Sequence, residues 1–148
     1  MNTNIKMRIR AESSSNTKIN VKARKFSLIV DEPQEIGGTD DGANPMEYIL
    51  AGLAGCINAV GHTVAKQMGI QLNSLKINIV GEINIAPFVG LNTADRSGFK
   101  NIKVSVTVGN TSLSQETLNK WFEKVEKICP VTDNLKNPTA INFKVVEQ

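Results

Sequence analysis

Residues 45–68 constrain the fold of this chain more than any other segment, because they predict one long amphipathic helix. The apolar residues recur at steps of three and four: Met46, Ile49, Leu50, Leu53, Ile57, Val60, Val64 and Met68. Asn44 is placed as the N-cap, Pro45 lies in the first turn, and Gly69 ends the helix. The stretch EYILAGLAGCINAVG is so rich in Ala and Gly that a neighbour can approach closely, either a second copy of the helix at a dimer interface or the rest of one domain.

Short runs with partial apolar alternation flank this helix and predict strands. They lie at residues 4–12, 17–23 and 25–31 before the helix, and at 75–85, 99–109 and 140–146 after it. A second helix is expected over 115–129, with Ser114 as its cap and Pro130 as its stop. The order βββ-α-ββ-α-β predicts an α+β fold with antiparallel strands, and the length predicts one domain, 1–148.

The composition excludes several classes of function. The chain has 17 Lys and Arg against 14 Asp and Glu, a net charge of +3, with few aromatic residues. This weak basic bias, spread along the chain, does not indicate a nucleic-acid-binding face. One His and two Cys are too few for the usual zinc sites, and TDDGAN does not continue into a calcium loop. We therefore expect neither a metal nor a nucleic-acid partner.

The sequence also carries expectations about the compartment. No segment reaches the ~18 uninterrupted apolar residues of a membrane helix, and the first residues lack the apolar core of a secretory signal. We expect a cytoplasmic protein without a membrane partner. In a reducing compartment the two cysteines are normally free thiols, so a disulfide between them would be transient and catalytic rather than structural.

Cys56 lies at the edge of the buried face of the long helix, about 80° from the centre of its apolar stripe. An edge position suits a reactive thiol, because a thiol at the centre of the face would be desolvated and its pKa raised. Gly52 and Gly55 fall on the far side of Cys56 from the stripe and leave room there. Taken alone, the helix is also compatible with a small core cysteine.

The second cysteine changes this balance. Cys129 is expected at the C-terminal end of the second helix, where the helix dipole disfavours a thiolate. It is therefore less suited to be the first nucleophile than to attack a sulfur that is already oxidised. This division of labour is that of a two-cysteine peroxidase.

Two segments resemble the OsmC/Ohr family, named for osmotically inducible protein C and the organic hydroperoxide resistance protein. DEPQEIGGTDDGANPMEYILAGLAGC is similar to the family's glycine loop, Asn-Pro, acidic residue and small-residue helix with the reactive cysteine. EKICPVTDNL is similar to its Cys-Pro motif. The order of the remaining elements fits the family fold over nearly the whole chain.

The resemblance implies an intertwined homodimer with two active sites at the subunit interface and no cofactor. It implies that Cys56 is the peroxidatic cysteine and Cys129 the resolving one. Family members reduce organic or fatty-acid hydroperoxides, and several take electrons from lipoylated proteins or other dithiols. The implied function is a thiol-dependent peroxidase in oxidative stress defence, acting on apolar-tailed hydroperoxides through a Cys56 sulfenic acid and a Cys56–Cys129 disulfide.

The chain departs from the family pattern at the acidic residue. In the organic hydroperoxide members an acid stands two positions after the Asn of Asn-Pro and pairs with an arginine that lowers the thiol pKa. Here Met46 fills that position and the acid follows as Glu47, about 180° around the helix from Cys56. Glu47 is expected either to serve the partner subunit or to stabilise the helix N-terminus through the dipole.

The activating cation is the second open point. Arg24 is the candidate, because it ends the second predicted strand close to the glycine loop, and a surface role is the alternative. Lys22 or Lys66 could activate the thiol instead. His62 is expected on the polar face of the helix, toward solvent or an interface rather than in catalysis.

The departure at Glu47 leaves a rival hypothesis from a different class of function. In it the chain is an OsmC-like dimer that binds a small apolar ligand, and its two cysteines are a redox sensor or fill space. A structural dimer with unreactive thiols is a third hypothesis. Fold similarity does not choose among these three.

Overall fold

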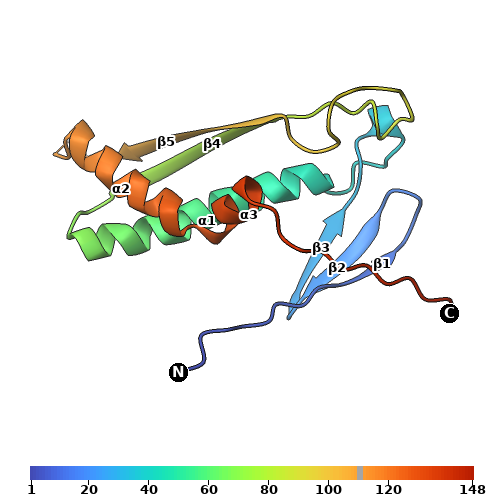
Figure 1. The fold of residues 1–148 in the computed structure, drawn as a ribbon, viewed down its shortest axis with the longest axis horizontal. Coiled ribbons are helices and arrows are strands. Elements are labelled where there is room, and N and C mark those ends of the chain that lie inside the picture. The colour runs from blue at the N-terminus through green and yellow to red at the C-terminus, as the bar shows by residue number, and fades with distance from the viewer. Residues whose placement is uncertain (110–111) are drawn as a thin grey trace. The chain divides into compact units, whose positions relative to one another are not determined.

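A computed structural model describes residues 1–109 and 112–148 of the chain. These residues form two compact units, Met1–Ala51 and Gly52–Gln148. Helix α1, Pro45–Met68, begins in the first unit and continues into the second (Figure 1). Its bounds are those expected from the apolar period and the flanking residues.

The N-terminal unit contains an antiparallel meander of β1 (Arg10–Ser13), β2 (Ile19–Ala23) and β3 (Phe26–Val30). The three expected strands are therefore present, but β1 begins at Arg10 instead of Asn4. Arg10 pairs with Lys22, one residue before β2 ends, so no residue of β2 lies opposite most of the segment before Arg10. A strand forms only where backbone groups find partners across the ladder.

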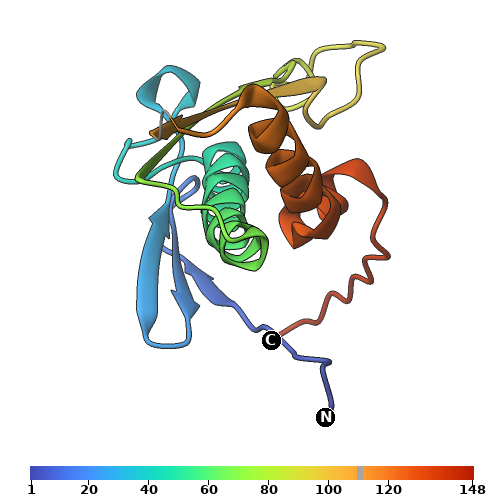
Figure 2. The ribbon, with the colours of Figure 1, turned by 90° about the vertical axis from the view of Figure 1, so that its left-hand side faces the viewer.

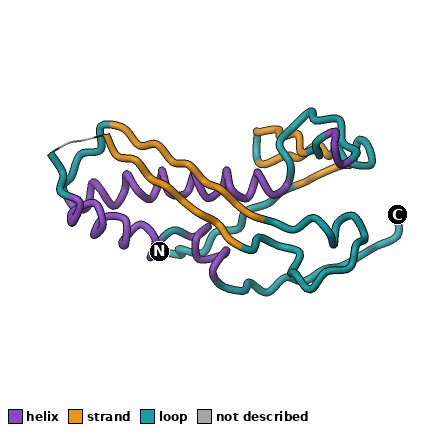
Figure 3. Tube along the Cα trace, turned by 90° about the horizontal axis from the view of Figure 1, so that it is seen from above, coloured by secondary structure: helices purple, strands orange, loops and turns teal. Residues whose placement is uncertain are grey.

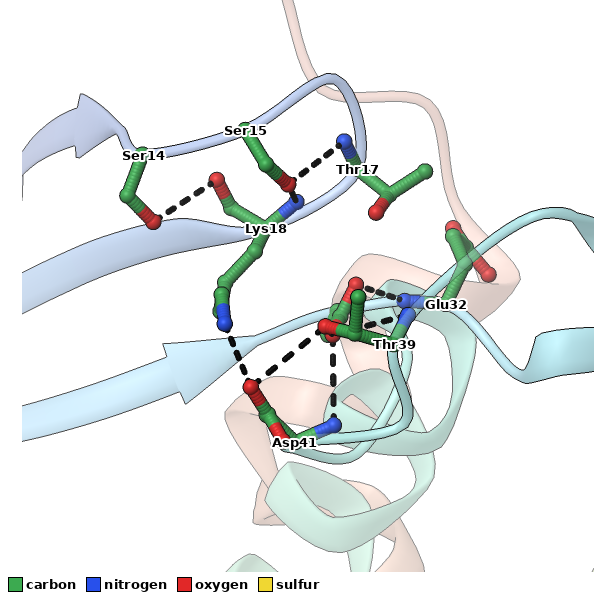
Figure 4. A network of polar contacts seen from close by, with 8 residues as sticks. Ser14, Ser15, Thr17, Lys18, Glu32, Thr39 and Asp41 are labelled. Atoms are coloured by element: carbon green, nitrogen blue, oxygen red, sulfur yellow. Dashed lines mark hydrogen bonds and ion pairs between the residues drawn. The ribbon is translucent and has the colours of Figure 1, made fainter.

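The loop between β3 and α1 is organised around a buried carboxylate, Asp31. Figure 4 labels Glu32, Thr39 and Asp41, three residues that donate to it. Asp31 accepts hydrogen bonds from the amide of Glu32 at 2.8 Å, the amide of Asp41 at 3.2 Å, and the amide and hydroxyl of Thr39. Asp41 also forms an ion pair with Lys18 from the β1–β2 turn. The loop includes a single 3-10 turn, Gln34–Ile36.

Both ends of α1 are capped by the residues that the sequence indicated. Asn44 Oδ1 accepts from the Glu47 amide at 2.9 Å, and Glu47 Oε2 accepts from the Asn44 amide at 2.8 Å, which makes a reciprocal capping box. At the other end Gly69 has φ +66°, and the Ile70 amide donates to the Ala65 carbonyl at 3.0 Å. This is a Schellman motif, which requires a residue in the left-handed region and so favours Gly.

The C-terminal unit packs helices against a two-stranded antiparallel ribbon. β4 (Ser74–Glu82) and β5 (Asn101–Gly109) pair along their whole length, as expected (Figure 3). Helix α2 (Gln115–Ile128) lies beside α1, and both face the ribbon (Figure 2). Ser114 caps α2 by accepting from the Thr117 amide at 3.1 Å.

The core of this unit lies between α1, α2 and the apolar face of the ribbon. Its buried residues are Leu53, Ile57, Val64, Ala65, Trp121, Val125 and Cys129. Trp121 donates from Nε1 to the Gly61 carbonyl at 2.9 Å, which fastens α2 to α1. A Cβ at Gly61 would meet the Trp121 ring at 3.0 Å, so a glycine allows this approach.

The C-terminal end of the chain differs from the expectation in two ways. Pro130 does not only stop α2, because a further helix, α3, runs over Pro130–Lys136. Pro is favoured at the first helical position, where its missing amide has no partner to lose. The expected strand over 140–146 is wrong for this chain: the described residues include no strand there, and Ile141, Phe143 and Val145 are exposed. An alternating pattern of apolar and polar residues does not form a stable strand without a neighbouring strand to pair with.

Among the described residues one helix, α1, is long and apolar enough to cross a membrane by length and composition alone. Its mean hydropathy reaches 1.4 over an 18-residue window, 28% of which is buried. The core helix of a soluble protein passes the same test, so one such helix is weak evidence for a membrane span. The expectation from the sequence used a stricter criterion, an uninterrupted apolar run, which Asn58 and His62 break.

Candidate active site

Cys56 lies in the part of α1 that belongs to the C-terminal unit, at the edge of its buried face. Leu53 and Ile57 on either side are buried, whereas Cys56 is half-buried and packs against the core from its margin. This is the position that the helical geometry predicted. A Cβ built on Gly52 or Gly55 would meet nothing within 4 Å, so the surface beside Cys56 is open within the chain.

Cys129 stands at the junction of α2 and α3. It is the C-cap of α2, with its amide bonded to the Val125 carbonyl, and the N-cap of α3, with its carbonyl bonded to the Asp133 amide, both at 3.0 Å. Its side chain is fully buried. The sequence analysis considered only the dipole of α2, which disfavours a thiolate at Cys129. Because α3 begins at the same residue, that argument does not hold.

The fold brings the two cysteines together. Their Sγ atoms lie 2.8 Å apart, although the residues are far apart in sequence, and both are free thiols. A disulfide has sulfurs about 2.05 Å apart, so a small movement is enough to form one. The family resemblance proposed these two residues as a pair, and in the structure their side chains are in contact.

The surroundings of the two thiols differ in electrostatic effect. Burial raises the pKa of Cys56, and the contact with Cys129 raises it further, while the Val131 amide acts in the opposite direction. Burial also acts to raise the pKa of Cys129, but the Cys56 thiol, the Thr132 hydroxyl and the Thr132 and Val131 amides outweigh it and lower this pKa. The Cys129 side chain makes no N-cap hydrogen bond to the amides of α3. These surroundings therefore shift the pKa values of the two thiols in opposite directions.

The other two site candidates from the sequence lie in the N-terminal unit. Arg24 is at the tip of the β2–β3 hairpin with φ 56°, and its guanidinium carbon lies 5.0 Å from the ring centroid of Phe26. Glu47 uses its carboxylate in the capping box of α1. Glu47 lies in the first turn of α1, where a favourable interaction with the helix dipole was expected, and its capping contact was not predicted. The catalytic roles of Glu47 and Arg24 stay predictions.

The remaining polar candidates are on the surface of their elements. Lys22 is exposed on β2, and Lys66 and His62 are exposed on α1, the last as expected from its place on the polar face. Within residues 1–109 and 112–148, no three His, Cys, Asp or Glu side chains gather as a metal site would require.

Thr132 is a site residue that the sequence analysis missed. Its hydroxyl is one of the groups that lower the pKa of Cys129. The available signal was Pro130 directly after Cys129, which allows Cys129 to be the N-cap of a following helix and brings the next residues back toward it. Because Pro130 was interpreted only as the end of α2, α3 was not predicted.

Comparison with known proteins gives consistent matches. The profile of the family described as OsmC-like protein matches residues 38–144. A hydroperoxide reductase of Mycoplasma genitalium is 28% identical over 138 residues, which are 93% of this chain and 90% of that protein.

Solved structures match over similar lengths. An OsmC-like protein from Mycoplasma pneumoniae has a TM-score of 0.76 at 23% identity, covering 92% of this chain and 91% of the other. An organic hydroperoxide resistance protein from Elizabethkingia anophelis has a TM-score of 0.69 at 20% identity, covering 93% of each chain. These likenesses establish the α+β fold that the sequence predicted.

Proposed function

Because the chain belongs to the OsmC-like protein family, we propose that it is a cysteine-based hydroperoxide reductase acting in defence against peroxides. The observation that carries the proposal is the 2.8 Å contact between the Cys56 and Cys129 sulfurs, one half-buried at an open helix surface and one fully buried. Support also comes from the Mycoplasma genitalium relative, which is a hydroperoxide reductase.

The chemistry needs only these two cysteines and an external reductant. Cys56 as thiolate attacks the terminal peroxide oxygen, the O–O bond breaks, and an alcohol leaves behind a Cys56 sulfenic acid. Cys129 then attacks that sulfur, hydroxide leaves, and the Cys56–Cys129 disulfide forms. An external dithiol or a lipoylated protein returns both thiols by exchange.

An apolar-tailed organic hydroperoxide is the proposed substrate class. Structural relatives include organic hydroperoxide resistance proteins. In this chain Cys56 packs at the margin of an apolar core that includes Leu53 and Ile57, and the partly buried Val131 packs against the same core. An alkyl tail finds apolar surface there, whereas hydrogen peroxide gains nothing from it. The proposal places the protein in the cytoplasm, where reduction keeps both thiols available.

A homodimer is part of the proposal. α1 exposes Gly52, Gly55 and Ala59, small residues that let a second backbone approach. Residues 5–9 and 141–145 have alternating apolar side chains that are exposed. Neither segment is paired in a sheet among the described residues. Such unpaired segments are suited to pairing with a second copy.

The proposal is tested by single substitutions in the reduced protein. Cys56→Ser is expected to abolish consumption of cumene hydroperoxide, and Cys129→Ser to leave one slow turnover, because the sulfenic acid then lacks its partner. Intact mass after one equivalent of peroxide should show loss of both thiols within one chain, faster than with hydrogen peroxide. Equal activity of Cys56→Ser and the parent protein would refute the assignment.

The use of the Glu47 carboxylate in the helix cap favours a second candidate function, a non-catalytic dimer that binds a small apolar ligand or acts as a thiol redox sensor. In the ligand-binding case both thiols of the reduced protein survive one equivalent of peroxide, whereas a redox sensor loses them without sustained peroxide turnover. Binding of an apolar ligand by the double variant Cys56→Ser/Cys129→Ser then identifies the ligand-binding role.

A further inference from the structure

The sulfurs of Cys56 and Cys129 differ in their access from solvent. Cys129 is 0% exposed and belongs to the buried core of the C-terminal unit. Cys56 is half-buried, and the helix surface beside it at Gly52 and Gly55 is open within the chain. A thiol that reduces a disulfide must reach one of its two sulfurs, so this difference in burial decides which sulfur is attacked.

The junction of α2 and α3 keeps the side chain of Cys129 enclosed. The amide of Cys129 makes a backbone hydrogen bond of 3.0 Å within α2, and its carbonyl makes another of 3.0 Å within α3. Glu126 of α2 and Lys136 of α3 form an ion pair that joins the two helices. A reductant therefore reaches the Cys129 sulfur only after this junction opens, whereas Cys56 needs no such opening.

The proposed function already requires a route from solvent to Cys56, because a hydroperoxide has to reach this sulfur. A small dithiol can use the same route once the product alcohol has left. A second copy of the chain packed on α1 would narrow this route, but it would not uncover Cys129, which is enclosed by its own chain. The order of access is therefore the same in the single chain and in a dimer.

We propose that the external dithiol attacks the Cys56 sulfur of the Cys56–Cys129 disulfide and that Cys129 is the leaving thiolate. This inference rests on the proposed function and adds the direction of its last step. Cys56 then makes every exchange with molecules from outside, first with the hydroperoxide and afterwards with the reductant. Cys129 reacts with Cys56 alone.

The exchange balances in two steps. One thiolate of the dithiol attacks Cys56 Sγ, the bond to Cys129 breaks, and the electron pair leaves on Cys129, which takes up a proton. The product is a mixed disulfide between the dithiol and Cys56. The second thiol of the reductant, as thiolate, attacks the reductant sulfur of this mixed disulfide, and Cys56 leaves as a thiolate. One protein disulfide and one dithiol thus become two protein thiols and one oxidised reductant.

The first experiment identifies the attacked sulfur in the full-length parent protein. Diamide forms the Cys56–Cys129 disulfide without peroxide, so the result does not depend on peroxidase activity. The monothiol N-acetylcysteine is then added, because it lacks the second thiol that would release Cys56. Acidic N-ethylmaleimide stops the reaction within seconds, before Cys129 can attack the adduct and form the internal disulfide again. Peptide mass spectrometry then shows which cysteine carries the adduct and which is alkylated.

The adduct is expected on Cys56, with Cys129 alkylated, in at least about tenfold excess over the reverse product. Equal amounts of the two products, or an excess of adduct on Cys129, overturn the inference and leave the peroxidase proposal intact. The peroxidase proposal fails separately if the reduced protein does not consume cumene hydroperoxide, even where the adduct forms on Cys56.

The second experiment measures the access of each thiol in the reduced protein. Cys129→Ser leaves Cys56, and Cys56→Ser leaves Cys129, as a matched pair of single-thiol variants. Each reacts with N-ethylmaleimide in buffer and in concentrated urea, and circular dichroism in buffer checks that both are folded. Cys129 is expected to react at least about tenfold more slowly in buffer than in urea, and Cys56 to be slowed much less. A Cys129 thiol that reacts equally fast in the folded and unfolded protein overturns the inference.

Discussion

At the scale of single residues, the same kind of hydrogen bond has different value in different surroundings. Trp121 Nε1 donates to the buried Gly61 carbonyl at 2.9 Å, and Tyr48 donates its hydroxyl to the Ile29 carbonyl at 2.7 Å at an exposed site. Water can replace the tyrosine if it is removed, but it cannot reach the carbonyl beneath Trp121. A buried acceptor that loses its donor retains its full desolvation cost.

We therefore expect Trp121→Phe to lower the free energy of unfolding by about 1–3 kcal/mol, and Tyr48→Phe by less than about 1 kcal/mol. Both substitutions remove one donor to a main-chain carbonyl and keep an aromatic ring. Urea unfolding followed by circular dichroism measures the two values. Equal losses would show that burial does not decide the cost.

Asp31 makes a pH-dependent contribution through its loop. The Thr39 hydroxyl, and then the Glu32 and Asp41 amides, hold the pKa of this carboxyl well below its ordinary value. A depressed pKa in the folded state means that the carboxylate stabilises the fold fully above the unfolded-state pKa of about 4 and progressively less as the pH falls below it.

The melting temperature of Asp31→Asn should lie below that of the parent protein at neutral pH, because an amide cannot accept all the donors around it. The difference should narrow as the pH falls below about 4, where the parent begins to lose its own carboxylate contribution. Melting curves at a series of pH values, with Thr39→Val as a partial removal of the same contacts, test this. A constant difference across that pH range would contradict it.

At the scale of elements, one side chain at the N-terminus of α1 has a structural role and a catalytic role predicted from the sequence. The carboxylate of Glu47 caps the helix through the Asn44 amide, and glutamine can make the same bond without the charge. The pair Glu47→Gln and Glu47→Ala therefore separates the cap from the charge.

Glu47→Ala is expected to lower the free energy of unfolding by about 1 kcal/mol, and Glu47→Gln by much less. Peroxide turnover by Glu47→Gln should stay within about twofold of the parent protein, since the capping contact remains. Chemical denaturation and steady-state peroxide consumption give the two numbers. A large loss of turnover in the stable Gln variant would instead assign the Glu47 charge to catalysis.

At the scale of the whole molecule, the proposed homodimer makes the exposed face of α1 testable. A Cβ at Gly55 meets nothing within 4 Å inside the chain, so a larger side chain is tolerated by the monomer. Gly55→Leu should therefore keep the chain folded but weaken association, whereas Lys124→Leu on the exposed side of α2 should not.

Light scattering after size-exclusion chromatography measures the mass of each variant. The parent protein and Lys124→Leu are expected to be dimers, and Gly55→Leu to shift toward monomer at the same concentration. Circular dichroism of Gly55→Leu checks that α1 is intact, since replacing a mid-helix glycine raises helix propensity. A Gly55→Leu protein that stays fully dimeric would place the interface elsewhere.

The sequence by itself determined the features whose causes lie within a few residues. The apolar period, Asn44, Pro45 and Gly69 defined α1, Ser114 defined the start of α2, and strand alternation defined both antiparallel sheets. These signals are local because helix caps and side-chain periodicity act within one turn or one strand. The family resemblance also proposed Cys56 and Cys129 as a pair, and these two residues are in contact in the structure.

Only the tertiary structure decided that the two cysteines are in contact and which segments near the chain termini form strands. The 2.8 Å contact of Cys56 with Cys129, the start of α3 at Pro130 and the role of Thr132 depend on packing between distant segments. Residues 140–146 have the alternation of a strand and are not one in this chain. The reason is the same in each case: a contact between two side chains and the pairing of two strands both need two partners, and the sequence describes each partner separately.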